Sequence, residues 1–293
     1  MIFRYGFVLM LCVCGLFASE VERYKLDDIK NVDEKSAMND WINSGFGLKA
    51  YKVNYIAPYS VRFGDEKYKS YTITDEYLNT EVEFQLSLKL KFGSNLFGLN
   101  EEYYGAYTQH AFWQLYAVSS PFRENVYNPE AFVVFPLTKN DWGIKSLKVA
   151  FAHRSNGQGS NENIEYPDDW QNRGNRSRSV NYFYTTMRLQ HDTLITDINA
   201  WMPIVSSLDD NTDLMTYTGY TSVKFNYFFN KSLITLMARG NFATLKGAVE
   251  LSYSYPIVKS VFFYTKLFSG YTESLIDYDT KITKLSIGFS FSR

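Results

Sequence analysis

Three features of the 293-residue sequence predict an all-β fold: a twelve-stranded antiparallel transmembrane β-barrel with short periplasmic turns and longer extracellular loops. After residue 46, apolar residues recur at every second position, which is the period of a strand with one apolar face. The connections alternate between short turns and longer polar loops, as in outer-membrane barrels. Aromatic residues make up 18% of the chain although its mean hydropathy is only -0.27, which is typical of aromatic girdles around a polar interior.

The first 45 residues precede the barrel pattern. The apolar run 7–17 follows a basic residue and ends in small residues, which is the pattern of a cleaved signal peptide, here residues 1–19. The polar segment 20–45 is expected to be periplasmic. Both cysteines, Cys12 and Cys14, lie within the signal peptide, so the mature protein is expected to contain no disulfide and no thiol nucleophile.

The charge balance limits the partners of the protein. The chain has 30 basic and 31 acidic residues and no basic stripe, so no nucleic-acid partner is expected. After the signal peptide, no segment has the roughly 20 consecutive apolar residues of a transmembrane helix. An exported chain of this kind is either soluble in the periplasm or a closed barrel in an outer membrane.

Twelve candidate strands make up the expected barrel domain, residues 46–293. Alternation is clearest in 81–92, where Val82, Phe84 and Leu86 are separated by polar residues, and again in 281–291. Strands of ten or more residues with alternate apolar faces argue against the alternative, a soluble β-sandwich or lipocalin-like barrel. The expected strands are 47–59, 81–92, 102–117, 127–137, 145–155, 178–191, 193–206, 216–229, 231–241, 247–257, 259–270 and 281–291.

The strand 145–155 contains the strongest candidate for chemistry. His153 and Ser155 are two residues apart, so both side chains point to one face, about 7 Å apart at their Cα atoms. Leu147, Val149 and Phe151 precede them on that face, which predicts that it faces lipid. An imidazole within reach of a hydroxyl is the minimum apparatus for nucleophilic acyl transfer. The alternative is that they are two ordinary polar residues at a strand end.

A third residue is needed to orient the imidazole, and Asn181 is the candidate. It lies near the start of the following strand, and antiparallel neighbours place such ends side by side. Its amide oxygen can hold one tautomer of His153, as the third member of a catalytic triad does. An amide stabilises the imidazolium less than a carboxylate, but it places no anion beside lipid.

These residues belong to two longer segments through which the chain resembles the outer-membrane phospholipase A family. The family's His-x-Ser-Asn-Gly segment matches residues 153–157, and its Ser-Arg-Ser-x-Asn segment matches residues 177–181. Shorter matches follow in the same order over most of the chain from about residue 46. They are Tyr107-Thr108-Gln109, Trp113-Gln114-Leu115, 119–124, Tyr127 with Pro129, 209–211, 251–253, Pro256-Ile257, 269–271 and 273–278.

The resemblance implies a calcium-dependent phospholipase of A1/A2 and lysophospholipase type in a Gram-negative outer membrane, with membrane phospholipids as substrate. By analogy, Ser155 is the nucleophile, His153 the general base and Asn181 the orienting residue. The Gly157 amide would bind the oxyanion. The family's activation by dimerisation implies a homodimer, with Gln109 at the contact. Its Ca2+ ligands correspond to the Ser119 hydroxyl of the partner subunit, the Gln158 carbonyl and the Ser177 hydroxyl.

Two departures from the family pattern affect these expectations. Arg154 stands where an acidic residue is common, and it faces away from the pair. The loop after His153 is longer by roughly residues 161–174, whose acidic side chains either supply calcium ligands of their own or are simply solvated.

Two other functions remain as alternatives. A passive barrel, such as a small porin or an adhesin, would use the same strand pattern, but twelve strands enclose a narrow lumen that side chains can plug. The side chains expected to form such a plug are Glu83, Gln85, Lys89, Lys148, Arg154 and Lys224. A soluble exported lipase would be expected to carry Gly-x-Ser-x-Gly, which the sequence lacks.

Overall fold

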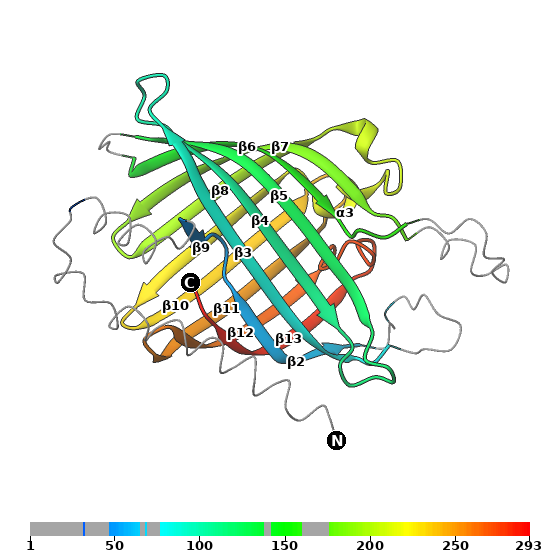
Figure 1. Ribbon diagram of the computed structural model, residues 1–293. Helices are drawn as coiled ribbons and strands as arrows, with labels where there is room; N and C mark the ends of the chain where they lie inside the picture. Colours follow the sequence, from blue (N-terminus) through cyan, green and yellow to red (C-terminus); the bar gives the residue numbers. More distant parts are fainter. Residues whose placement is uncertain (1–31, 33–46, 65–67, 69–76, 138–141, 160–175) are drawn as a thin grey trace. The chain divides into compact units, whose positions relative to one another are not determined.

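The computed structural model describes residues 32, 47–64, 68, 77–137, 142–159 and 176–293. The chain divides into two units, Met1–Leu48 and Lys49–Arg293, and the second forms the barrel (Figure 1). The predicted signal peptide and periplasmic segment lie outside the described residues. The strands are β1 (Leu48–Ala50), β2 (Tyr55–Phe63), β3 (Thr80–Ser94), β4 (Glu102–Trp113), β5 (Phe122–Pro136), β6 (Ile144–Ser155), β7 (Ser179–His191), β8 (Leu194–Pro203), β9 (Thr221–Phe229), β10 (Ser232–Asn241), β11 (Lys246–Val258), β12 (Val261–Gly270) and β13 (Ile282–Ser290).

The predicted twelve-stranded antiparallel barrel is confirmed. Each strand from β2 to β13 pairs with its sequence neighbour, and β13 pairs with β2, so the sheet closes on itself. Closure satisfies the backbone hydrogen-bonding groups of every strand, as a hydrocarbon environment requires. The three-residue β1 joins the same sheet beside β3.

Several predicted strand boundaries were wrong. β5 begins at Phe122 rather than at 127, and β8 ends at Pro203 rather than at 206. The predicted strand 47–59 is broken between β1 and β2, where Lys52 turns inward and donates to Asn128 and Glu130 at 3.1 and 2.6 Å. The predicted strand 102–117 ends at Trp113, whose indole donates to the carbonyl of Ser120 in a tight turn.

The predicted strand 216–229 begins only at Thr221, because a short helix, α3 (Leu214–Thr218), precedes it. Leu214 and Met215 of this helix are buried in a small cluster with Val180 and Tyr278. The apolar residues of 214–218 therefore serve loop packing rather than a strand.

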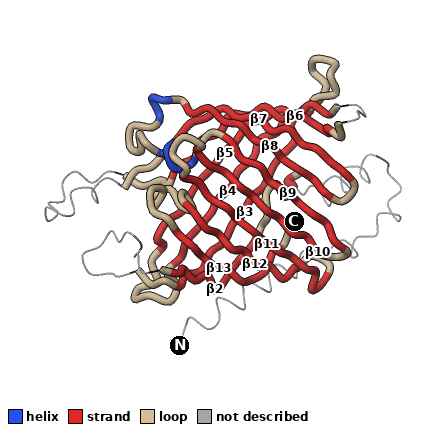
Figure 2. Tube along the Cα trace, turned by 180° about the vertical axis from the view of Figure 1, so that it is seen from behind, coloured by secondary structure: helices blue, strands red, loops and turns tan. Residues whose placement is uncertain are grey.

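The two rims of the barrel differ, as the alternating connections predict. At one rim, hairpins such as β7–β8 and β9–β10 turn at Asp192 and Asn230, whose φ angles of 48° and 51° suit tight turns. The opposite rim carries α3 and a 3-10 helix, η3 (Val205–Ser207), both in the β8–β9 connection (Figure 2). Among the described residues, no helix is long and apolar enough to cross a bilayer.

The outer face of β6 is apolar, as its alternation predicts. Leu147, Val149 and Phe151 are exposed at 39–40%, whereas Ala150 and Ala152 between them are buried. The inward-facing Lys148 donates to the hydroxyls of Tyr51 and Tyr184 at 2.9 and 3.0 Å. The strand therefore presents its apolar face outward and its polar face to the lumen.

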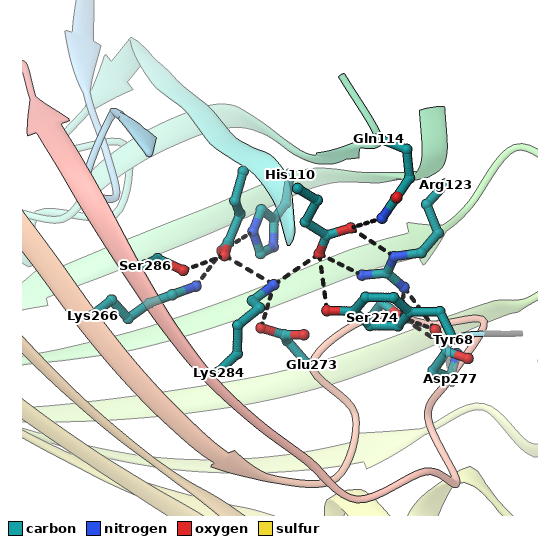
Figure 3. Close-up of polar contacts among 12 residues, drawn as sticks. Tyr68, His110, Gln114, Arg123, Lys266, Glu273, Ser274, Asp277, Lys284 and Ser286 are labelled. Carbon is teal, nitrogen blue, oxygen red and sulfur yellow. Dashed lines mark hydrogen bonds and ion pairs between the residues drawn. The ribbon is translucent and has the colours of Figure 1, made fainter. Parts of the chain in front are cut away.

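Buried charged side chains fill part of the lumen (Figure 3). Arg123 makes a bidentate pair with Glu81, with both N···O distances at 2.9 Å, and a third bond of 2.6 Å to Asp277. Lys284 lies within 3.1 Å of Glu81 and 3.0 Å of Glu83. The two lumen-facing glutamates of β3 are thereby tied to β5, to the last strand and to the β12–β13 loop.

A second part of this network surrounds Glu83. Its carboxylate accepts bonds from Lys266 and from Ser286, the latter at 2.9 Å, and lies 2.7 Å from His110 Nε2. Glu273 reaches Lys284 at 2.6 Å from the β12–β13 loop, and burial raises the pKa of the Glu273 carboxyl.

The lumen also contains a cavity of about 450 Å³ that borders the network. Of the side chains expected to plug the barrel, Glu83 belongs to the network, whereas Gln85, Arg154 and Lys224 line the cavity. Lys89 lies over the rings of Tyr51 and Tyr104. Part of the expected set therefore fills the lumen, whereas three of its side chains border the cavity.

Candidate active site

The register between β6 and β7 places Asn181 directly opposite His153. The Asn181 Oδ1 atom lies 2.7 Å from His153 Nδ1. Because a carbonyl oxygen only accepts, Nδ1 donates this bond, and in the neutral form of the ring the lone pair is then on Nε2. This tautomer is the one that can act as a base through Nε2.

Ser155 lies two residues farther along β6 on the same face, opposite Tyr127 of β5 and Ser179 of β7. In the part of the chain that the structure describes, Ser155 Oγ has no hydrogen-bond partner, and no bond joins it to His153. Bonds between a nucleophile and its base are often long without substrate and tighten in the complex. The hydroxyl is partly exposed at the lipid-facing surface.

The β8–β9 connection holds Asn181 in place. The backbone amide of Asn181 donates to Ser207 Oγ at 2.8 Å, and the backbone carbonyl of Asn181 accepts from the backbone amide of Ile204 at 2.7 Å. The 3-10 helix that contains Ser207 therefore fixes the end of β7. Sequence reasoning missed Ser207, because its contact depends on how a loop 26 residues away folds back.

Gly157 follows Ser155 in a conformation that favours glycine. Its φ is +62°, and a Cβ atom at this position would lie 2.7 Å from Cε2 of Tyr127. Both constraints oppose a larger residue at this position. The backbone of Gly157, two residues after Ser155, therefore has a conformation that local geometry constrains.

Asn156 is a second residue whose structural role the sequence analysis missed, although it lies in the segment 153–157. It is 2% exposed, and its Nδ2 donates to the carbonyl of Arg176 at 2.8 Å. Its Oδ1 accepts from the amides of Arg178 and Gln158 at 3.1 and 3.3 Å. The buried side chain of Asn156 thus joins both ends of the long β6–β7 loop. Its position within the matched segment 153–157 was the only sequence signal of this role.

Two of the three predicted calcium ligands belong to the loop ends that Asn156 joins. Gln158 is bonded to Asn156 directly, and Ser177 lies between the two residues whose backbones Asn156 holds. A carbonyl and a hydroxyl are oxygen donors of the kind that calcium accepts, with waters completing its shell. Ser119 is exposed in the β4–β5 connection at the same rim, with a φ of +61°. The acidic residues of the long loop, Glu162, Glu165, Asp168 and Asp169, lie outside the described residues.

Gln109 lies on the same outer surface as the candidate pair. It is opposite Tyr127, which is opposite Ser155, so Gln109 and Ser155 are two strand spacings apart, about 10 Å. Its Nε2 donates to Asn125 at 3.1 Å. The neighbouring Leu86, opposite Gln109 on β3, is 47% exposed.

Together these residues can perform ester chemistry at a lipid-facing surface. The imidazole of His153 is held by Asn181, the Ser155 hydroxyl lies two residues farther on the same strand face, and a backbone amide follows at Gly157. The side chains that precede them on this face, Leu147, Val149 and Phe151, are apolar and exposed. A substrate with an ester close to long hydrocarbon chains fits this surface.

Comparisons with known proteins agree with this geometry. The model of the family described as Phospholipase A1 matches residues 33–291. Phospholipase A1 proteins from Proteus vulgaris and Escherichia coli K12 are each 32% identical over 248 residues, covering 83% of this chain and 81% of their own length. The structure of outer membrane phospholipase A from Escherichia coli is similar with a TM-score of 0.73 and 30% identity, covering 85% of this chain and 93% of that one. A calcium-bound dimer of the Salmonella typhi outer membrane phospholipase is similar with a TM-score of 0.74, also at 30% identity, over 85% and 94% of the two chains.

Proposed function

Because the chain belongs to the phospholipase A1 family and is an outer-membrane hydrolase, we propose that it is a calcium-dependent enzyme that uses a Ser-His-Asn acyl-enzyme mechanism and acts as a homodimer. Its substrates are phospholipids and lysophospholipids, cleaved at either acyl ester. The observation that carries the mechanism is the 2.7 Å bond from His153 Nδ1 to Asn181 Oδ1. His153 lies two residues before the partly exposed Ser155 on the same strand.

In the first half-reaction, His153 Nε2 removes the proton of Ser155 Oγ as this oxygen attacks the ester carbonyl carbon. The carbonyl oxygen becomes an anion, which accepts a bond from the Gly157 amide. When the intermediate collapses, the alkoxide of the glycerol backbone leaves and takes the proton from His153. The lysophospholipid departs and the acyl chain remains on Ser155.

In the second half-reaction, His153 Nε2 removes a proton from water as the water attacks the acyl carbonyl. The bond from the acyl carbon to Ser155 Oγ then breaks, Oγ takes the proton back from His153, and the fatty acid is released. Asn181 keeps the imidazole in one orientation throughout both halves. Gln158 and Ser177 would hold calcium, and the bound ion would supply positive charge beside the developing oxyanion.

Dimerisation is supported by the outer-facing position of Gln109 in the same row as Ser155. The calcium-bound relative from Salmonella typhi is also a dimer. Two copies that meet at this face would form clefts for acyl chains next to each serine.

A hydrolysis assay on mixed micelles, with and without a calcium chelator, tests this function. The parent should release fatty acid only with calcium, and Ser155→Ala should be inactive. Ser179→Ala is the matched control, because this serine lies directly opposite Ser155 on β7 and should be dispensable. Activity of Ser155→Ala at the parental level would exclude the proposed nucleophile, and insensitivity to chelation would exclude the metal. Substrates labelled on one acyl chain at a time report whether both positions are cleaved.

A further inference from the structure

The turn between β3 and β4, residues 95–101, is unusually apolar for a turn at the rim opposite the candidate active site. Leu96, Phe97 and Leu99 are 71%, 78% and 59% exposed. Figure 1 shows this turn as a loop that projects beyond the neighbouring strand ends. Two other connections at the same rim are polar: Asp192-Thr193 joins β7 to β8, and Asn230-Lys231 joins β9 to β10.

This apolar turn has a defined internal structure. Glu101 is fully buried in it and accepts bonds from the amides of Phe97 and Leu99 at 2.7 and 3.0 Å. Its carbonyl accepts from the Asn95 amide at 2.7 Å. The amide of Asn100 donates to Asn95 Oδ1 at 3.0 Å. Four backbone amides of the turn, those of residues 95, 97, 99 and 100, therefore have internal acceptors, and the three apolar side chains are exposed.

The apolar surface of the turn continues the lipid-facing surface of β3. Leu86, Leu90 and Phe92 on the outer face of β3 are 47%, 40% and 67% exposed. A bulge between Lys91 and Gly93 gives Phe92 no partner in the register with β4. The ring centroid of Phe92 lies 6.3 Å from that of Tyr103 at the base of the turn.

The residues around the turn are those found at a membrane boundary. Lys91 near the end of β3 and Glu102 at the start of β4 form an exposed ion pair of 2.7 Å at the base of the turn. Tyr103 and Tyr104 lie next to them, and Trp142 of the adjacent β5–β6 connection is 77% exposed. Amphipathic aromatic rings and lysines are enriched at the level of lipid headgroups.

We propose that the β3–β4 turn is a membrane anchor that inserts Leu96, Phe97 and Leu99 into the periplasmic leaflet of the outer membrane. Lipid is the partner because the apolar tip is continuous with a surface that lipid already covers. Exposed in water, three large apolar side chains would stay hydrated, whereas the headgroup boundary accepts them. The internal bonds of Glu101 reduce the number of backbone amides that the turn would have to desolvate at this boundary. The turn belongs to the strands that carry Leu86 and Gln109, so it anchors the periplasmic end of the proposed dimer face.

Site-specific fluorescence tests the anchor. A single cysteine, Phe97→Cys, is placed in a full-length chain that also carries Cys12→Ser and Cys14→Ser, and is labelled with a polarity-sensitive fluorophore. The protein is reconstituted into phosphatidylcholine–phosphatidylglycerol vesicles with lipids that carry quenchers at known depths. Lys231→Cys in the β9–β10 turn is the matched control at the same rim, and Leu236→Cys on the outer face of β10 is the lipid-exposed reference.

The label at position 97 should emit at shorter wavelength than the label at 231. Lipid quenchers should place it about 5–10 Å into the boundary between headgroups and acyl chains. Emission equal to that of the 231 label would show a tip in water and would overturn the proposal. Short-wavelength emission without quenching by lipids would show that protein covers the tip, either a second copy or the segment 20–45, and would also overturn it. A heat-modifiable gel shift identifies folded protein in every sample, and the readout does not depend on lipase activity.

Discussion

Removing the side-chain amide of Asn181 tests whether this residue acts only by orienting the imidazole of His153. Asn181→Ala deletes one neutral hydrogen bond of 2.7 Å, which contributes about 0.5–1.5 kcal/mol. At about 1.36 kcal/mol per tenfold change in rate, kcat should fall roughly twofold to tenfold. His153→Ala removes the base itself and should cost about 10²–10⁴. Asn181→Asp keeps an acceptor oxygen and should retain more activity than Asn181→Ala.

The assay is fatty-acid release from mixed micelles at saturating calcium, with Asn226→Ala on β9 as the control for loss of a strand asparagine. The decisive sample is the double variant His153→Ala/Asn181→Ala. If Asn181 acts through the imidazole, the double variant should be no slower than His153→Ala alone. An additional loss in the double variant, or equal losses in the two single variants, would refute an orienting role.

Three further outcomes follow from the geometry. Gly157→Ala should lower kcat more than about tenfold, since a φ of +62° and a 2.7 Å approach to Tyr127 both oppose a Cβ atom. Recovery in the double variant with Tyr127→Ala would assign the loss to the contact, and parental activity of Gly157→Ala would refute the argument that this backbone conformation requires glycine. Arg123→Met should lower the free energy of unfolding by about 3–5 kcal/mol in urea titrations in vesicles, because its guanidinium is buried between two carboxylates. The half-exposed Arg188→Met should change this free energy by at most about 1 kcal/mol, and a similar loss in both variants would contradict the reasoning. Asn156→Ala should weaken calcium binding roughly tenfold to a hundredfold in titration calorimetry, because two or three bonds of about 1 kcal/mol each between the loop ends are lost. An unchanged calcium affinity would show that the loop ends held by Asn156 do not form the metal site.

The strand pattern was largely predictable because each strand has one apolar face. Alternation in β6 correctly separates Leu147 and Phe151 from Lys148, since a period of two assigns every residue to one face. The direct pairing of His153 with Asn181 confirms the expected closeness of the two strand ends. Whether these residues catalyse the reaction stays a prediction.

Features that depend on distant parts of the chain were not predictable. The break between β1 and β2 arises because Lys52 reaches Glu130, 78 residues away. No local pattern near residue 52 encodes that contact. In the same way, the bond from Asn181 to Ser207 depends on the fold of the β8–β9 connection. Sequence periodicity specifies faces, but it does not specify which loop covers which strand end.

The buried network in the lumen has a consequence for how the barrel forms. Glu81 and Glu83 belong to β3, whereas their partners Lys266 and Lys284 belong to the last two strands. Until the C-terminal hairpin arrives, a growing sheet holds two carboxylates without these cations, and desolvating them is costly. Insertion into the bilayer and closure of the sheet should therefore occur together, late in biogenesis. A chain cut before β12 should remain an unclosed ribbon that the cell's proteases can remove.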